Sequence, residues 1–141
     1  EYNSLSDPVR QQFESEGVTV HHISGDDLDV LYERADAGII PLLPTEYNNL
    51  AVPVKLFEYL SYGIPIITTD LDEVGSFVKL HDCGFVCDDD HKELAQAIRM
   101  LSTDKEVYLR KKTNAIQALK ENRWTDRVET VASDLAGMST H

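Results

Sequence analysis

Residues 52–70, VPVKLFEYLSYGIPIITTD, restrict the fold more than any other segment of the chain. Pro53 is typical of the first turn of a helix, and Gly63 is typical of the position just after a helix ends. The residues predicted to face inward from this helix are Val54, Phe57 and Leu60, with Leu56 beside them. Residues 64–69 then form an apolar run typical of a strand that is buried on both faces. A helix that leads directly into a buried strand indicates an α/β fold.

Helical and strand-like patterns alternate over most of the chain. Further strands are predicted at residues 18–23, 37–42 and 84–87. Further helices are predicted at about residues 8–16, 24–35 and 73–80, from residue 90, from 103 to about 121, and around Trp124, Val128, Val131 and Leu135. Alternation of this kind specifies a parallel sheet with helices on both faces.

Three pairs of residues match the capping box, in which two side chains three positions apart bond each other's backbone amides at a helix start. The pairs are Ser24 with Asp27, Asp90 with Glu93, and Thr103 with Glu106. Asp88, Asp89 and Asp90 also resemble part of a calcium loop, but the glycine and the distal glutamate of an EF-hand are absent. This acidic run is therefore interpreted as the cap of the helix that follows it.

Composition sets limits on the size and the partners of the protein. The 141 residues are 42% apolar, which suits a single domain with one core. A formal net charge of -12 argues against a nucleic acid or an anionic membrane as the main partner. Cys83 and Cys87 fit no zinc, redox or disulfide pattern and are interpreted as reduced residues at the ends of a strand. Because no apolar run reaches the roughly 18 residues of a membrane span, we expect a soluble, cytoplasmic protein.

Residues 44–50, PTEYNNL, form the longest polar irregular stretch in the middle of the chain. They are predicted to leave the carboxyl end of a buried parallel strand and to lead into a helix. Open α/β sheets bind ligands at such loops. The residues that this argument places at the expected site are Thr45, Glu46, Tyr47, Asn48 and Asn49.

Lys55 and Glu58 lie in the first two turns of the helix that follows Pro53. The free amides near residues 50–53 are suited to bind an anion such as a phosphate. Lys55 opposes the helix dipole, so it either contacts such an anion or is an exposed lysine paired with Glu58 at i,i+3. Glu58 leans back toward the helix start, where it is either a solvated surface residue or an acceptor for a vicinal diol such as a ribose.

Residues 35–70, ADAGIIPLLPTEYNNLAVPVKLFEYLSYGIPIITTD, resemble the nucleotide-sugar-binding half of GT-B-fold glycosyltransferases, in particular the retaining family 4 or group 1 enzymes. Within them, PVKLFEYLSYGIPII is similar to that family's pattern P-x-K-x-F-E-Y-x-x-x-G-x-P-[VI]-[IV]. The similarity continues through EVGSFV and CGFVCDDD and extends more weakly to Trp124. The resemblance implies a Rossmann-like parallel sheet with helices on both faces, the C-terminal half of a GT-B fold without its first strands.

The resemblance also implies a substrate and a site. The donor would be a UDP-, GDP- or ADP-sugar, and no metal cofactor would be needed, because helix amides and basic side chains such as Lys55 replace the cation. Glu58 would meet the ribose. The diphosphate would lie at the helix start, around Leu50, Ala51, Val52 and Pro53. A saccharide or lipid-linked acceptor would bind an N-terminal domain that this sequence does not contain.

The sequence departs from the family pattern in two ways. Many members place a second, sugar-facing glutamate eight residues before the one that matches Glu58, and here that position is Leu50. Glu46, Asn48 or Asn49 could serve instead, and a catalytically inactive nucleotide-binding or regulatory module is the alternative to an enzyme. The two strands and the Arg- and Lys-bearing loop that normally open this half-domain are also absent.

The chain is therefore expected to be one partial donor-binding domain, residues 1–141, of a longer glycosyltransferase and to be inactive as an isolated segment. For the whole protein, a peripheral position at the membrane is the alternative to a purely cytoplasmic one. Without its first strands the sheet would expose an edge, so the isolated piece is expected to self-associate, to rearrange or to belong to a longer chain. A receiver-like signalling domain is a weaker alternative, because Asp36 precedes its predicted strand and Asp70 stands alone after one.

Overall fold

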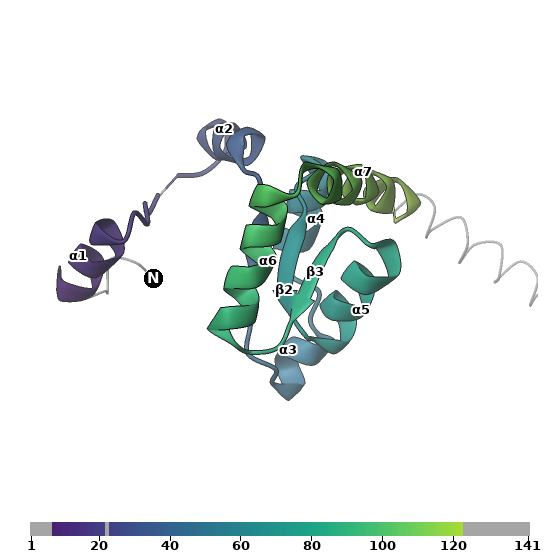
Figure 1. Cartoon of the computed structure of the whole chain (residues 1–141), viewed down its shortest axis with the longest axis horizontal. Helices are drawn as coiled ribbons and strands as arrows, with labels where there is room; N and C mark the ends of the chain where they lie inside the picture. The colour runs from purple at the N-terminus through teal and green to yellow at the C-terminus, as the bar shows by residue number, and fades with distance from the viewer. Residues whose placement is uncertain (1–6, 22, 123–141) are drawn as a thin grey trace, which may run out of the picture. The chain divides into compact units, whose positions relative to one another are not determined.

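The structure is a computed structural model that describes residues 7–21 and 23–122 (Figure 1). The chain divides into two compact units, residues 1–31 and 32–141. The described part of the smaller unit holds α1 (Asp7–Ser15) and the start of α2 (Asp26–Arg34). Gly17 follows α1 with φ +80°, a conformation that glycine adopts without strain, and this confirms it as the stop of the first helix.

The larger unit contains a parallel sheet of three strands in the order β1-β2-β3. The strands are β1 (Gly38–Ile40), β2 (Ile66–Thr69) and β3 (Gly84–Cys87). Ile66 pairs with Gly38 on one side and Gly84 on the other. A Cβ atom at Gly84 would lie 1.8 Å from the carbonyl oxygen of Ile66, so only glycine allows β3 to approach β2 in this register. The predicted parallel sheet is confirmed.

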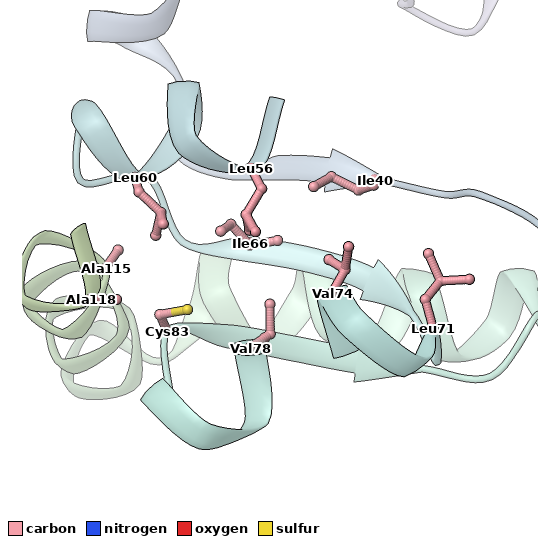
Figure 2. Packing of buried hydrophobic residues seen from close by; sticks show 10 residues of the cluster. All are labelled: Ile40, Leu56, Leu60, Ile66, Leu71, Val74, Val78, Cys83, Ala115 and Ala118. Atoms are coloured by element: carbon pink, nitrogen blue, oxygen red, sulfur yellow. The ribbon is translucent and has the colours of Figure 1, made fainter. Parts of the chain in front are cut away.

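Helices α4 (Val54–Ser61) and α5 (Asp72–His81) cover one face of the sheet. Figure 2 shows how side chains from both helices, the strands and α7 (Lys105–Glu121) meet there. The buried residues of this cluster are Ile40, Leu56, Leu60, Ile66, Leu71, Val74, Val78, Cys83, Ala115 and Ala118. Their removal from water supplies the main driving force for folding of this unit.

Helix α6 (His91–Thr103) covers the opposite face. Its Ala97 and Leu101 pack with Ile67 and Cys87 in a second buried cluster. Ile66 and Ile67 therefore enter different clusters, as alternating side chains of a strand must. Helices on both faces, as predicted, make β2 a strand buried on both sides.

Helix α7 lies against the amino-terminal end of the sheet. Its side chains contact Asp36, Gly63 and Asp82, each of which comes shortly before a strand. Gly63 has φ +64°, and a Cβ there would lie 2.8 Å from a side-chain carbon of Ile116. Gly63 is thus confirmed as the stop of α4, and its lack of a side chain also admits α7.

The predicted strand at residues 18–23 is wrong. Residues 18–21 and 23 are irregular in the structure, and His22 lies outside the described residues. A strand is stabilised by backbone hydrogen bonds to a neighbouring strand, and the described sheet is complete with β1, β2 and β3. The alternating pattern VTVHHI alone does not provide such a partner.

The predicted strand at residues 37–42 is shorter than expected and is buried on one side. Only residues 38–40 are paired, and Ile39 is exposed between two buried neighbours. The strand lies at the edge of the described sheet, where Ile39 faces an open cavity. The apolar run therefore predicted the strand correctly and its burial only in part.

The helix after Pro53 is confirmed, but one of its residues predicted to face inward does not. Pro53 is the N-cap, with ψ 142°, and the helix begins one residue later at Val54. Val54 is 72% exposed, whereas Leu56 and Leu60 are fully buried. Leu60 faces inward as predicted, and Phe57 is partly buried against the same cluster. The prediction is therefore wrong only at Val54, and Leu56, expected at the side of the stripe, lies in the core.

Residues 44–50 are partly helical, although the sequence predicts an irregular stretch. Helix α3 (Glu46–Leu50) begins after Thr45, whose hydroxyl accepts a hydrogen bond from the Asn48 amide at 3.2 Å. Its last turn is closed by the Ala51 amide, which donates to the Tyr47 carbonyl at 3.1 Å. An N-cap threonine was present in the sequence, and it predicts such a helix start.

The acidic residues after β3 cap α6, as expected. Asp90 is the N-cap and accepts a hydrogen bond from the Lys92 amide at 2.9 Å. Glu93 bonds the amide of Asp88 at 2.7 Å instead of the Asp90 amide of a standard capping box. The expected box of Thr103 with Glu106 is wrong, because Thr103 ends α6 and the N-cap of α7 is Asp104.

Helix α5 spans the predicted region, and Val74 and Val78 are buried as expected while Phe77 is partly buried. The predicted helix around Trp124, Val128, Val131 and Leu135 lies outside the described residues. Among the helices that are described, none is long and apolar enough to cross a membrane.

Candidate functional site

Three polar side chains meet beside α4, in the larger unit. Lys55 Nζ lies 2.9 Å from Glu58 Oε2, one turn further along the same helix. The Tyr32 hydroxyl donates to Glu58 Oε2 at 2.7 Å and accepts a hydrogen bond from Lys55 Nζ at 2.6 Å. The i,i+3 pairing of Lys55 with Glu58 is therefore confirmed, and so is the backward lean of Glu58 toward the helix start.

The two oxygens of the Glu58 carboxylate differ in their surroundings. Both Lys55 and Tyr32 bind Oε2. Within residues 7–21 and 23–122, Oε1 has no hydrogen-bond or ion-pair partner. A carboxylate offers about two acceptor positions on each oxygen. Oε1 is therefore able to accept hydrogen bonds from a ligand while Oε2 remains held.

Electrostatics keeps both ionisable groups of the pair charged. The hydrogen bonds to Tyr32 and Glu58 raise the pKa of Lys55 well above its usual range. The hydrogen bonds from Lys55 and Tyr32 lower the pKa of Glu58. The Lys55 side chain is 52% exposed and that of Glu58 is 37% exposed, so a ligand can reach both. Such an exposed pair adds little to the stability of the fold.

Aromatic packing fixes the position of Tyr32. Its ring lies edge-on to Tyr59, with 5.8 Å between ring centroids, and 5.2 Å from the Tyr62 ring. Tyr59 in turn packs against Gly38 of β1, where a Cβ atom would lie 2.4 Å from a ring carbon. Gly38 thus lets the ring of Tyr59 sit on the edge strand, and Tyr59 supports the ring that carries the hydroxyl group.

The start of α4 provides fewer free amides than the sequence argument assumed. Pro53 has no N–H, and the Ala51 amide already bonds Tyr47. Among the described contacts, the amides of Val52, Val54 and Lys55 have no acceptor. No side chain caps this helix start. The free amides of Val52, Val54 and Lys55 are still suited to bind an anion. That anion would lie beside residues 52–55.

The site residues predicted on the preceding stretch lie on α3. The Asn48 side chain donates to the Leu43 carbonyl at 2.9 Å and so closes the loop before the helix. Asn49 Oδ1 is buried and has no partner among the described residues. Glu46 is exposed, and Leu50 is 72% exposed. None of these four side chains makes a described polar contact with Lys55 or Glu58.

A cavity of about 180 Å³ lies at the carboxyl ends of the strands, on the α6 face of the sheet. Its lining includes Thr68 and Thr69 of β2, and Asp88, Asp89 and Asp90 after β3. Three neighbouring carboxylates disfavour an anion there. An anionic ligand is therefore better placed at the start of α4, next to Lys55.

The two cysteines have no part in this chemistry. Cys83 and Cys87 are free and buried on either side of β3. Burial raises the pKa of the Cys83 thiol to about 11 and also raises the pKa of Cys87. Both are therefore protonated at neutral pH and unreactive, as the sequence indicated.

The sequence predicted the contact between Lys55 and Glu58 but did not predict that Tyr32 joins them. Tyr32 lies in the predicted helix at residues 24–35, adjacent to the apolar stripe of Leu28, Leu31 and Ala35. Its hydroxyl meets Glu58 26 residues later in the chain. No local pattern signals such a contact, because it depends on the packing of Tyr32 against Tyr59 and Tyr62.

Comparison with known proteins agrees with the resemblance carried by residues 35–70. The model of a family described as "Glycosyl transferases group 1" matches residues 3–104. A Bacillus subtilis (strain 168) protein named "Putative teichuronic acid biosynthesis glycosyltransferase TuaH" is 38% identical over 47 residues. That match covers 33% of this chain and 12% of the relative, so the chain spans a small part of the relative's length. No solved structure matches significantly. The extent of the family match shows that the chain belongs to the group 1 glycosyl transferases.

Proposed function

We propose that this chain is the nucleotide-sugar donor-binding part of a retaining glycosyltransferase. Glu58 receives the ribose, and the start of α4 with Lys55 receives the diphosphate. The observation that carries the proposal is that Lys55 and Glu58 lie together at an uncapped helix start, within the segment that the family matches. The donor is a UDP-, GDP- or ADP-sugar.

The difference between the two oxygens of the Glu58 carboxylate supports the ribose assignment. Oε2 is held by two donors, while Oε1 has no partner among the described residues. A vicinal diol brings two O–H donors, and Oε1 has room for both. Hydrogen bonds to a charged acceptor are the stronger kind, so this contact would contribute substantially to affinity.

The diphosphate assignment is supported by the local balance of charge. The chain as a whole has a formal net charge of -12 and repels anions. Lys55 and the amides of Val52 and Val54 offset this repulsion locally. During transfer the bond from the anomeric carbon to the diphosphate oxygen breaks, and the diphosphate leaves with the electron pair. Amides and a cation at this position stabilise the charge that develops, without a metal ion.

Transfer of the sugar needs an acceptor as well. A saccharide or lipid-linked acceptor provides the hydroxyl oxygen that forms the new glycosidic bond, and its proton passes to the departing diphosphate. We assign acceptor binding to another domain of a longer cytoplasmic protein, because the match to the relative spans only 12% of that relative. We therefore expect the described segment on its own to bind the donor without catalysing transfer of the sugar.

A second candidate is a nucleotide- or nucleotide-sugar-binding module of the same fold without catalytic activity. The observation that favours it is Leu50, an exposed apolar residue at the position where many family members have a sugar-facing glutamate. Leu50 cannot hydrogen-bond a donor sugar. Nucleotide binding at Glu58 is common to both candidates, so only turnover separates them.

Calorimetric titration with UDP, GDP and ADP tests the proposal. We expect one of the three to bind the protein, and binding by none would contradict the donor site. Hydrolysis of the matching nucleotide sugar by the full-length protein, measured as release of the nucleoside diphosphate, then favours the enzyme. Binding without hydrolysis or transfer favours the inactive module.

A further inference from the structure

We propose that Tyr32 is the positioning residue that gives this site its selectivity for a ribose over a deoxyribose. The inference rests on the proposed function, because it concerns the same Glu58 carboxylate. Tyr32 lies 23 residues before Lys55 and 26 before Glu58, outside the donor-site motif of residues 53–67.

The hydroxyl of Tyr32 fixes which oxygen of Glu58 is available. It donates to Oε2 at 2.7 Å, the same oxygen that Lys55 approaches at 2.9 Å. Together these two donors occupy the acceptor positions of Oε2. A ligand diol is thereby directed to Oε1, and the carboxylate is prevented from rotating to exchange its two oxygens.

Lys55 strengthens this arrangement through the same hydroxyl. Its ammonium donates to the Tyr32 oxygen at 2.6 Å and lies 5.3 Å from the centre of the ring. A hydroxyl that accepts a hydrogen bond from a cation is polarised and becomes a better donor to Glu58. The three groups therefore form a closed cycle, in which loss of the Tyr32 hydroxyl weakens the orientation of both other side chains.

The packing of the Tyr32 ring holds its hydroxyl group in a fixed position. Tyr32 is 9% exposed and packs against both Tyr59 and Tyr62. Glu58, by contrast, has a flexible side chain that is 37% exposed. Holding a flexible carboxylate in its binding geometry before the ligand arrives lowers the entropy cost of binding. Selectivity for the second hydroxyl of the ribose depends on this geometry.

The test compares ribose with 2′-deoxyribose ligands. Wild-type protein and the Tyr32→Phe variant are titrated with UDP, GDP and ADP and with their 2′-deoxy forms. We expect wild-type protein to prefer the ribose form of its nucleotide by about tenfold, the scale of one charge-assisted hydrogen bond. Tyr32→Phe is expected to reduce this preference to about threefold or less, mainly by weakening the ribose form.

Tyr59→Phe is the matched control. It also removes one hydroxyl from a ring in the same aromatic cluster, and within the described part of the chain Tyr59 makes no hydrogen bond to Lys55 or Glu58. Its ribose preference should equal that of wild-type protein. Thermal unfolding of both variants shows whether the cluster remains folded.

The outcomes separate the inference from the proposed function. A wild-type protein that binds none of the three diphosphates contradicts the proposed function itself. A wild-type protein that binds without a ribose preference, or a Tyr32→Phe variant that keeps the full preference, overturns the role of Tyr32 and leaves nucleotide binding in place. An equal loss of preference in Tyr59→Phe also overturns it, because the effect would then come from the ring packing.

Discussion

Lys111 is a charged side chain that α7 buries almost completely. Only 7% of it is exposed, and its ammonium is hydrogen-bonded to Asp82 Oδ1 and lies 4.7 Å from the centre of the Phe85 ring. Asp82 Oδ2 also forms an ion pair with Arg110 Nε at 3.2 Å. The backbone of Asp82 adopts a left-handed conformation, φ 47°, at the end of α5. One aspartate thus ends a helix and neutralises the buried cation of another helix.

Replacement of Asp82 by asparagine should destabilise the larger unit. Asparagine tolerates the left-handed backbone but leaves Lys111 without its counter-charge. Removing one partner of a fully buried pair costs about 3–5 kcal/mol, and because Asp82 is 50% exposed we expect about 1–2 kcal/mol at pH 7. Urea unfolding measures this difference. Asp89→Asn, at an exposed position, is the control and should change the free energy of unfolding by less than about 0.5 kcal/mol.

The effect of Asp82 should depend on pH. Lys111 holds the pKa of Asp82 below its usual value in the folded state. A lowered pKa gives stability that is present above the unfolded-state pKa of about 4 and is lost as the pH falls through the folded-state value. The difference between wild-type protein and Asp82→Asn should therefore be constant from pH 5 to 7 and shrink in more acidic solution. A difference that persists undiminished at pH 2 would contradict the ion-pair account.

At the scale of elements, the junction between α6 and α7 shows which residue begins a helix. The side chain of Asp104 accepts hydrogen bonds from the amides of Glu106 and Val107 at 3.1 and 3.0 Å. Thr103 instead donates to the Arg99 carbonyl within α6. Both residues are common N-caps, and only the observed hydrogen bonds distinguish them.

Alanine substitutions at these two neighbours provide a direct comparison. Asp104→Ala should lower the free energy of unfolding by about 1 kcal/mol, because it leaves two amides of α7 without an acceptor. Thr103→Ala should have an effect within about 0.5 kcal/mol of zero. Denaturant unfolding of both variants decides between the two caps. A larger loss for Thr103→Ala would restore the original sequence prediction.

The elements that were predicted correctly from the sequence are those whose signals are local. Gly63 and Asp90 mark a helix end and a helix start through their own backbone or side chain. The apolar run at residues 64–69 was sufficient to identify β2. The strand expected at 18–23 was wrong because pairing depends on a partner that the pattern does not contain. On α4, Leu60 was predicted correctly and Val54 was not, because a mostly apolar stretch such as VKLFEYL does not by itself decide which apolar residue of its first turn faces the core.

The same distinction applies to the candidate site. Lys55 and Glu58 are three residues apart on one helix, so helical geometry alone predicts their contact. Tyr32 joins them only after packing on Tyr59, and Tyr59 reaches its position only because β1 has glycine at residue 38. Long-range packing of this kind has no signature in a single sequence.

At the scale of the whole molecule, recognition of an anionic ligand must be local. The chain has 25 acidic against 13 basic residues, and the cavity beside α6 is lined by three aspartates. Lys55 and the free amides at the start of α4 are the contrasting feature. Affinity for a nucleoside diphosphate should therefore depend on the single carboxylate and single cation of this site, and little on other surface charges.

The most direct test is a calorimetric comparison of Glu58→Gln with Glu73→Gln. Both substitutions remove one negative charge, and Glu73 is an exposed residue in the first turn of α5. With the nucleoside diphosphate that the wild-type protein binds, we expect Glu58→Gln to bind about tenfold more weakly or worse, a loss of over ~1.4 kcal/mol. Glu73→Gln should bind within about twofold of wild type. Equal affinities of the two variants would contradict the assignment of Glu58 to the nucleotide.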